Sequence, residues 1–170
     1  KALKKFERGA EEKRFYWEII TKNDFHRISE FDALFIRTTT NVNHYTYTFA
    51  RKAYSENIVS IDDANSIIRC SNKVFLTEQA SLKKVATPKT IIVHKGNRDT
   101  LTSELSLPIV IKQPDSQFSE GVYKAGNVEE LNAILDKLLK TSDLLIAQEF
   151  VMTKFDWRIG VFNKKPLFAC

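Results

Sequence analysis

Leu107-Pro-Ile-Val-Ile-Lys112 is the stretch that decides the fold, an apolar run that ends in a lysine. Proline is tolerated at the start of a strand, and Ile109–Ile111 is typical of a buried one. The polar, glycine-terminated segment 113–121 then predicts a loop, and Val122–Ala125 a returning strand. A lysine beside such a loop can hold phosphate, because it brings a positive charge next to hydroxyl and backbone donors. On this feature alone, a strand-end lysine that merely reaches water is the commoner case.

The segment after this loop predicts one helix and another strand. Apolar residues at helical spacing over 127–140 indicate an amphipathic helix that follows the N-cap residue Asn127. Leu144–Ala147 is a continuous apolar strand that runs into Gln148-Glu-Phe-Val151. Exposed backbone at such an end can pair with the edge of a base, with Phe150 and Val151 as apolar surroundings. Alone, this pattern is more often a plain strand end.

Strand and helix patterns alternate upstream of this region. Phe31–Arg37 predicts a strand, and the polar Thr38–Asn43 predicts a loop at its carboxyl end, where ligands gather in α/β folds. Further strands are expected at 17–21, 57–61, 89–93, 156–162 and 166–170. Further helices are expected at 45–54 and 72–82, and a charged helix or tail at 1–14. Asp62 and Asp63 can cap a further segment that extends to Ile68. The order predicts an α/β chain in two parts, residues 1–62 and 63–170.

The composition excludes several classes of protein. Of the 170 residues, 43% are hydrophobic and 28% charged, which excludes a disordered or low-complexity chain. The sequence contains no run of about 18 apolar residues, so it predicts no membrane helix. Residues 1–14 lack the apolar stretch of a signal peptide. Cys70 and Cys170 make no disulfide framework, and two reduced thiols favour the cytoplasm.

The positive charge is concentrated near the start of the sequence. The net charge is +5, and residues 1–14 hold six basic against three acidic residues, a net of +3. The remaining residues therefore carry only +2, which is ordinary for a soluble enzyme. Nucleic-acid binding needs a dense basic face, so we do not expect a nucleic-acid partner.

Several common catalytic motifs are missing from the sequence. There is no G-x-G-x-x-G, and Gly121 and Gly126 have P-loop spacing but are followed by Asn127-Val128 in place of Lys-Ser/Thr. The histidines are scattered, no paired cysteines suggest zinc, and no G-x-S-x-G is present.

Two further charged features are weak alone. Asp156-Trp-Arg158 puts a carboxylate and a guanidinium on one face of an expected strand. The carboxylate suits sugar hydroxyls and the guanidinium suits an anion. The alternative is that the two form a structural ion pair. Lys73 opens an expected helix, where a cation is unfavourable for the helix itself. That small penalty suggests an anion nearby, although surface lysines are common at such places.

The order of these features is more specific than any one of them. Asn72-Lys73, Pro88-Lys-Thr90, Leu107–Lys112, the serine-containing loop up to Gly121, the amphipathic helix, Gln148–Val151 and Asp156–Val161 together resemble the ATP-grasp superfamily. The likeness is to its RimK-like and glutathione-synthetase-like carboxylate–amine ligases, and it covers about residues 60–170. The resemblance implies an ATP-grasp nucleotide-binding part at 63–170, preceded by the tail of a pre-ATP-grasp domain at 1–62.

The resemblance also implies a role for each matched residue. Lys73 and Lys112 would contact the ATP phosphates, and the loop from Ser116 through Ser119 to Gly121 would close over them. Gln148, Glu149, Phe150 and Val151 would surround adenine and read it through backbone groups, and Asp156 would bind the ribose. Arg158 would face the reacting carboxylate or phosphate. The loop lacks a glycine until Gly121, unlike the glycine-rich form usual in the family.

The activity implied is ligation with Mg-ATP. A carboxylate of a small molecule or peptide would be phosphorylated, and an amine, from a glutamate-like amino acid, would attack the acyl phosphate. The family's magnesium ligands lie beyond the adenine segment, so we expect none in this chain, which we interpret as an inactive fragment of a longer protein. Arg37 and the loop 38–43 are candidates for contacting the acid, and a structural role for Arg37 is equally open.

Three alternatives remain at this point. A kinase of the same superfamily, phosphorylating a small hydroxyl compound, would use every residue named above. A nucleotide-binding module without catalysis would keep the lysines but not the metal ligands. A basic protein that binds RNA or the ribosome through residues 1–14 is the third. An oligomer is possible, and no membrane partner is expected.

Overall fold

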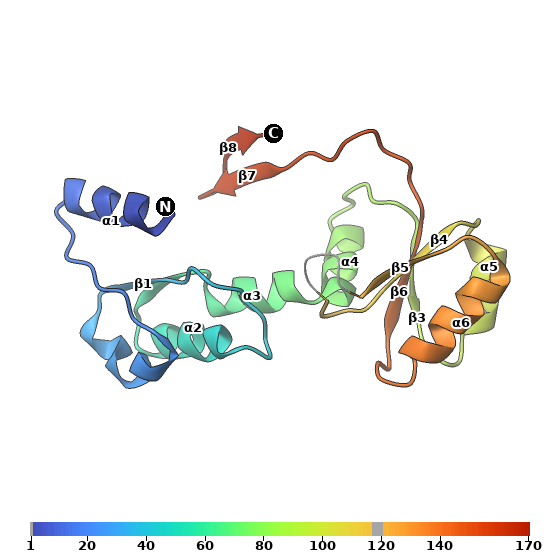
Figure 1. Ribbon diagram of the computed structural model, residues 1–170, viewed down its shortest axis with the longest axis horizontal. Helices are drawn as coiled ribbons and strands as arrows, with labels where there is room; N and C mark the ends of the chain where they lie inside the picture. Colours follow the sequence, from blue (N-terminus) through green and yellow to red (C-terminus); the bar gives the residue numbers. More distant parts are fainter. Residues whose placement is uncertain (1, 117–120) are drawn as a thin grey trace. The chain divides into compact units, whose positions relative to one another are not determined.

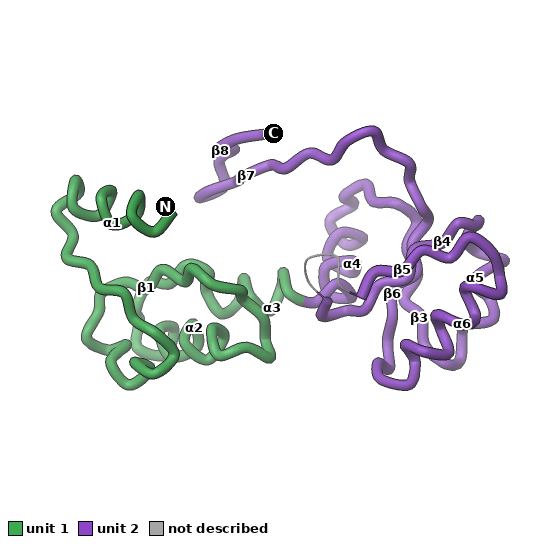
Figure 2. Tube along the Cα trace, viewed as in Figure 1, with its two compact units in different colours: residues 1–71 green, residues 72–170 purple. Residues whose placement is uncertain are grey.

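The computed structural model describes residues 2–116 and 121–170. The chain forms two compact units, residues 1–71 and 72–170 (Figure 2). Each unit has its own sheet and its own buried core, so each is described separately.

The first unit is built around a pair of short parallel strands. Its elements are α1 (Ala2–Glu12), η1 (Lys22–Glu30), β1 (Ala33–Phe35), α2 (Tyr45–Ser55), β2 (Val59–Ile61) and α3 (Ala64–Ser71). Ala33 lies opposite Val59, and Phe35 lies opposite Ile61. The helix α2 connects the two strands, as a crossover between parallel strands requires. Phe49 and Ala53 of α2 pack with Ile28 of η1 in the core of this unit.

The division between the two compact units falls after Ser71. Asp63 caps α3, because its carboxylate accepts hydrogen bonds from the backbone N–H of Asn65 (2.9 Å) and Ser66 (3.0 Å). Ala64 and Ile67 of α3 are buried against Ala50 of α2. This burial joins α3 to the first unit, and the second unit begins at Asn72.

The second unit contains a four-stranded antiparallel sheet in the order β3-β6-β4-β5. Its elements are α4 (Lys73–Leu82), β3 (Thr90–Val93), η2 (Arg98–Thr100), α5 (Leu101–Glu104), β4 (Ile109–Lys112), β5 (Val122–Ala125), α6 (Val128–Leu138), β6 (Leu145–Glu149), β7 (Ile159–Phe162) and β8 (Lys165–Ala169). Ile111 of β4 pairs with Tyr123 of β5 on one side and with Ala147 of β6 on the other. The strands and helix expected over 107–149 are thereby confirmed.

One face of this sheet carries the core. Alternate strand residues are buried against apolar residues of α5 and α6: Val93, Ile109, Ile111, Ala125, Leu145 and Ala147 on the strands, and Leu101, Leu131, Leu135 and Leu138 on the helices. Successive strand residues point to opposite faces, so the residues between these lie on the other side of the sheet. The helix α4 lies on that other side, away from α5 and α6 (Figure 1).

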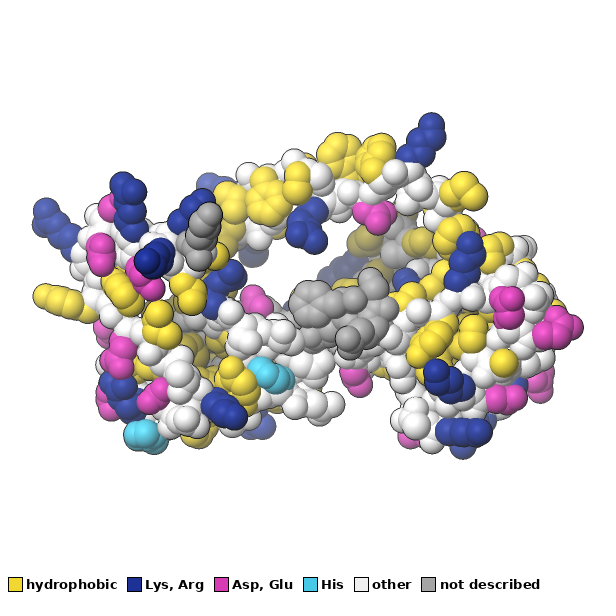
Figure 3. All heavy atoms as spheres, viewed as in Figure 1, with side chains coloured by type: hydrophobic (Ala, Val, Ile, Leu, Met, Phe, Trp, Pro, Cys, Tyr) yellow, Lys and Arg dark blue, Asp and Glu magenta, His cyan; other side chains and the backbone are white. Residues whose placement is uncertain are grey.

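The strands β7 and β8 form a hairpin that pairs only with itself among the described residues. Asn163 and Lys164 at its turn both have positive φ angles, 47° and 63°, as a tight two-residue hairpin turn requires. A Cβ at Gly160 would lie 2.6 Å from Cδ1 of Phe168, so a larger residue there would require the exposed Phe168 ring to move. Large apolar side chains along 151–168 are exposed (Figure 3).

Two sequence expectations about strands were wrong. Residues 17–21 form no strand, because no neighbouring strand pairs with them within the described chain. The strand expected from residue 156 begins only at Ile159, which leaves Asp156 outside it.

Among the described residues no helix has both the length and the apolar character needed to span a bilayer.

Candidate nucleotide-binding site

The sheet face opposite the core gathers the lysines and polar residues that the sequence singled out. Directly paired residues of antiparallel strands share a face, and the register pairs Thr90 with Gln148, Val110 with Gln148, and Val110 with Lys124. We call this side the lysine face; it consists of Thr90, Ile92, Val110, Lys112, Val122, Lys124, Ile146 and Gln148. Lys112 and Gln148 therefore come together through strand register and not through proximity in the sequence.

Lys112 is held by a neighbouring strand and does not simply extend into water. Its ammonium donates a 2.6 Å hydrogen bond to Oε1 of Gln148. The amide Nε2 of Gln148 donates a 2.7 Å hydrogen bond to the hydroxyl of Thr90. That hydroxyl donates a 2.7 Å bond to the carbonyl of Pro88. A chain of hydrogen bonds thus crosses the three strands β4, β6 and β3.

Lys73, the first residue of α4, contacts the loop that follows β4. Its ammonium donates a 2.9 Å hydrogen bond to the hydroxyl of Ser116 and another to the Ser116 carbonyl. The loop is tied to the start of α4 by two more bonds. The Lys73 N–H donates to the Pro114 carbonyl at 2.9 Å, and the Asn72 amide donates to Asp115 at 2.8 Å. Lys73 is therefore positioned at the described end of this loop.

Gly121 closes the loop in a conformation that favours glycine. Its φ angle is +67°, and an added Cβ would lie 2.8 Å from Cβ of Ser116 and 2.6 Å from Oε1 of Gln113. Its carbonyl accepts a 2.9 Å hydrogen bond from the Gln113 N–H, which brings the two ends of the loop together. Ser119, expected as a phosphate contact, lies outside the described residues.

Both lysines are electrostatically suited to an anion. Burial lowers the pKa of Lys112 from its ordinary value. Burial also lowers the pKa of Lys73, the positive charge of Lys112 lowers it further, and Asp115 partly opposes the change. Two ammonium groups close enough to influence each other therefore stand partly desolvated, and a bound anion would relieve this cost.

The segment at the end of β6 leaves one backbone donor available. The N–H of Glu149 donates to the carbonyl of Lys89 at 3.0 Å, and that of Phe150 donates to the carbonyl of Pro108 at 3.3 Å. Within the described chain, no backbone partner is recorded for the N–H of Val151. Of the residues expected to read adenine through backbone groups, Val151 is thus the one with its N–H uncommitted.

The side chains of this segment have roles that the sequence did not reveal. Glu149 accepts a 2.8 Å hydrogen bond from the backbone N–H of Lys89, which ties the end of β6 to the start of β3. The Lys124 ammonium lies 3.7 Å from the ring centre of Phe150. Thr90 and Lys124 both belong to expected strands. Only the register between the strands reveals that Thr90 meets Gln148 and that Lys124 meets Phe150.

The structure does not bring Asp156 and Arg158 to the lysines. Both are exposed, and no ion pair joins them among the described residues. The hydroxyl of Thr153 donates a 3.3 Å hydrogen bond to Asp156. The backbone of Arg158 pairs with that of Cys170 through bonds of 2.8 and 3.0 Å. Their expected roles, at ribose and at the reacting group, rest on the resemblance alone.

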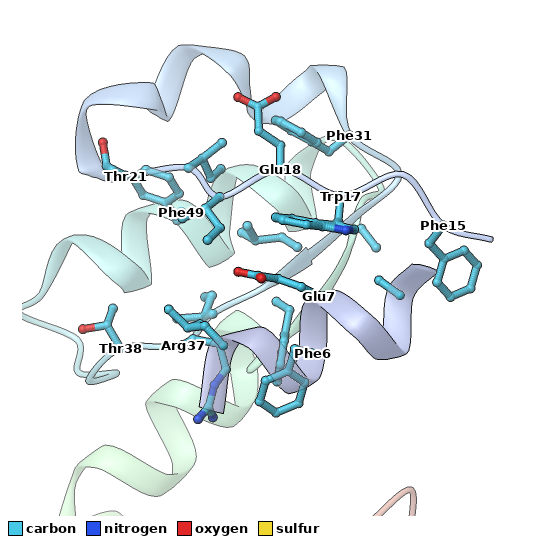
Figure 4. Close-up of a pocket in the computed structure, with 18 of the residues that line it drawn as sticks. Phe6, Glu7, Phe15, Trp17, Glu18, Thr21, Phe31, Arg37, Thr38 and Phe49 are labelled. Carbon is cyan, nitrogen blue, oxygen red and sulfur yellow. The ribbon is translucent and has the colours of Figure 1, made fainter. Parts of the chain in front are cut away.

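The first unit contains a separate cavity of about 690 Å³, formed by α1, residues 15–21, β1 and α2. Its walls are largely apolar, and Figure 4 shows the aromatic residues Phe6, Trp17, Phe31 and Phe49 around it. Arg37 lines it, with its guanidinium 5.0 Å from the ring centre of Phe6 and 5.4 Å from that of Phe35. No carboxylate pairs with Arg37 within the described chain.

Comparison with curated proteins finds relatives that are ligases. The chain is 34% identical over 96 residues to the alpha-aminoadipate–LysW ligase LysX of Saccharolobus solfataricus, a match over 54% of this chain and 35% of the relative. It is 25% identical over 144 residues to LysX of Sulfolobus acidocaldarius, over 82% of this chain and 51% of the relative. The chain thus spans about half or less of these relatives. No protein-family profile matches it.

Solved structures with the same fold include ATP-grasp proteins. The D-alanine–D-alanine ligase of Bacillus anthracis matches 89% of this chain and 50% of its own, with a TM-score of 0.69 and 17% identity. The same ligase complexed with ATP gives a TM-score of 0.68 at 18% identity, over 89% of this chain and 51% of its own. The RimK domain ATP-grasp protein of Sphaerobacter thermophilus matches 73% of this chain and 47% of its own, with a TM-score of 0.62 and 15% identity. The chain therefore shares the fold of these ATP-grasp structures, and part of its sequence is similar to LysX.

Proposed function

We propose that this chain is the nucleotide-binding part of an ATP-dependent carboxylate–amine ligase. The observation that carries the proposal is the arrangement of Lys73 and Lys112. They come from a helix start and a strand end, Lys73 contacts Ser116 while Lys112 contacts Gln148, and burial lowers the pKa of both. Two partly desolvated cations with unused N–H donors match the charge of a polyphosphate.

In this proposal ATP lies along the lysine face. The triphosphate contacts the ammonium groups of Lys73 and Lys112. Adenine lies by the end of β6, where the Val151 N–H donates to the ring and Phe150 provides apolar contact. The complex of the Bacillus anthracis ligase with ATP supports ATP as the ligand, since that protein shares the fold.

The reaction proposed for the whole protein has two steps. A carboxylate oxygen of the acid substrate attacks the terminal phosphorus of ATP, which gives an acyl phosphate and ADP. The amine of an amino acid then attacks the acyl carbon, forms the amide, and releases phosphate and a proton. The lysines contribute by positioning the triphosphate and by stabilising the charge that moves onto ADP.

Magnesium, which the superfamily resemblance implies, supplies neutralisation of the polyphosphate charge. Among residues 2–116 and 121–170, no group of three or more His, Cys, Asp or Glu side chains could hold a metal ion. The proposal therefore assigns no described residue to the metal and derives no step from it.

Arg37 is the proposed contact for the acid substrate. It follows a strand whose carboxyl end opens into a loop, the place where α/β folds bind ligands. Its guanidinium is stacked on two rings and lines the cavity of the first unit, so its N–H donors are available for a carboxylate.

The first experiment measures nucleotide binding by this chain, as the fluorescence change of mant-ATP on titration. We expect Lys73→Ala and Lys112→Ala each to weaken binding by about 10- to 100-fold, the value of a lost charge-assisted hydrogen bond. Lys95→Ala, at an exposed lysine, is the matched control and should bind like wild type. Equal affinity in all four proteins would refute the site.

The second experiment measures products with the full-length gene product, Mg-ATP, and panels of acids and amino acids. Equal release of ADP and free phosphate, only when acid and amine are both present, is expected for the ligase. ADP without free phosphate would identify a kinase. Neither product, despite bound ATP, would leave a binding module for the substrates tried.

A further inference from the structure

The orientation of the Gln148 amide is set from both of its ends. The Thr90 hydroxyl has a single hydrogen, and the Pro88 carbonyl at 2.7 Å can only accept it. The Thr90 oxygen must therefore accept from the atom of Gln148 that lies 2.7 Å away, which makes that atom Nε2. At the other end the Lys112 ammonium can only donate, so it requires Oε1. Both requirements give the same orientation.

Each member of this chain lies on a different strand, so strand register holds the chain in place. Thr90 is on the edge strand β3, Gln148 is on the central strand β6, and Lys112 is on β4. Gln148 provides the one side-chain acceptor recorded for Lys112 within the described residues. An ammonium has three N–H donors, so two remain for a ligand, and their direction depends on where the Gln148 oxygen holds the third.

We propose that Thr90 is a positioning residue, which fixes the Gln148 amide and thereby aims the free donors of Lys112 at a nucleotide phosphate. The inference rests on the proposed function for its ligand, but its first step concerns Lys112 alone. Without the Thr90 hydroxyl, the Gln148 amide can turn. Either the NH₂ group of Gln148 would then face the ammonium, or the Gln148 oxygen would move away from it. In both cases Lys112 would lose its acceptor.

A double-mutant cycle tests whether Thr90 acts through Gln148. Thr90→Val removes the hydroxyl at nearly constant volume, and Thr90→Ser keeps it. We expect Thr90→Val to weaken mant-ATP binding about tenfold, Thr90→Ser to restore it to within about twofold, and Thr90→Val to cause no further loss in a Gln148→Met background. Equal losses in both backgrounds, or no rescue by serine, would overturn the inference.

A measurement without nucleotide separates this inference from the proposed function. The side-chain carbons of ¹³C-labelled lysine report the pKa of Lys112 by NMR, and Lys112→Arg identifies its signal. Thr90→Val should lower the Lys112 pKa further and Thr90→Ser should not, since the acceptor stabilises the charged form. The neighbouring charges, Lys73 and Asp115 by α4 and Lys124 on β5, are the same in all three proteins. An unchanged pKa overturns the inference even if ATP binds, whereas a shifted pKa with no ATP binding refutes only the ligand.

Discussion

The ammonium of Lys73 and the hydroxyl of Ser116 are joined by a 2.9 Å hydrogen bond in which the lysine is the donor. The same hydroxyl donates its own hydrogen to the carbonyl of Gln113 at 2.9 Å. Ser116 therefore has no hydrogen left for a phosphate in this arrangement. In this arrangement Ser116 holds Lys73, and the direct phosphate contact expected from the sequence stays a prediction.

The variant Ser116→Ala should therefore weaken nucleotide binding less than Lys73→Ala does. Loss of one neutral-acceptor hydrogen bond to the ammonium predicts a change of less than about tenfold. Titrations of mant-ATP against the two variants in parallel measure the difference. A loss as large as that of Lys73→Ala would instead show that the hydroxyl itself binds phosphate.

Binding of a polyphosphate should be accompanied by proton uptake at alkaline pH. The pKa values of Lys73 and Lys112 are lowered in the free protein, and a bound anion raises them. Uptake should appear between the lowered and the raised pKa values and vanish well below them, where both groups are already charged. Calorimetry in buffers of different ionisation enthalpy measures it, and Lys112→Ala should reduce it. No uptake across that window would contradict the assigned environment.

The same shifts affect stability with a definite sign. The unfolded chain, where a lysine has a pKa of about 10.4, holds these protons to higher pH than the folded chain does. The contribution of Lys73 and Lys112 to the free energy of unfolding should therefore rise with pH between their lowered pKa values and about 10.4. Urea unfolding of wild type and a Lys73→Met/Lys112→Met variant checks this. The rise in that window should be smaller in the variant, and identical slopes would be the contrary result.

Local patterns in the sequence predicted much of the second unit but not how its strands meet. The helix α6 and the strand β4 follow from apolar periodicity, which neighbouring residues alone determine. The contact of Thr90 with Gln148 depends on the register of β3 against β6, which no local pattern shows. The role of Lys112 at the site stays a prediction, and the amide that holds its ammonium could be found only from the register of β4 against β6.

The strand expected at 17–21 was wrong for a related physical reason. Apolar and aromatic residues favour a strand only when a neighbouring strand is available for pairing. Thr21 instead begins η1, where its hydroxyl accepts from the N–H of Asn23 and its own N–H donates to Asp24 at 2.8 Å. The spacing of Thr21 and Asp24 is a helix-start signal that the apolar pattern obscured.

Replacing Gly121 should strain the loop. Gly121→Ala places a Cβ at a φ of +67° and 2.8 Å from Cβ of Ser116, so we expect a destabilisation of about 1 to 3 kcal/mol. The displaced loop should also weaken mant-ATP binding. Gly126→Ala is the control, since its Cβ would meet its nearest atom, Oε2 of Glu130, at 3.4 Å. Denaturant unfolding measures both variants, and equal stabilities would contradict the strain.

Asn72 has two functions that substitution can separate. Its oxygen caps α4 by accepting from the N–H of Val74 (3.0 Å) and Phe75 (3.1 Å), while its NH₂ donates to Asp115. Asn72→Ser keeps a cap and loses the tie to the loop, whereas Asn72→Ala loses both. We expect the alanine variant to lose about 1 kcal/mol more stability than the serine variant, with equal weakening of mant-ATP binding. Wild-type binding by Asn72→Ser would show that the tie to the loop is unimportant.

Arg37 offers a test of the acid-binding role against a structural one. Its guanidinium packs on Phe6 and Phe35 and has no carboxylate partner within the described chain. In the full-length gene product, Arg37→Met keeps an apolar side chain of similar length on the rings and removes the charge. We expect the KM for the acid to rise about 10- to 100-fold, the value of a lost charge-assisted hydrogen bond, with mant-ATP binding unchanged. Arg51→Met, at an exposed arginine of α2, is the matched control and should leave both quantities alone. A lower melting temperature with an unchanged KM would instead assign Arg37 to packing, because only a carboxylate contact links the guanidinium charge to the acid.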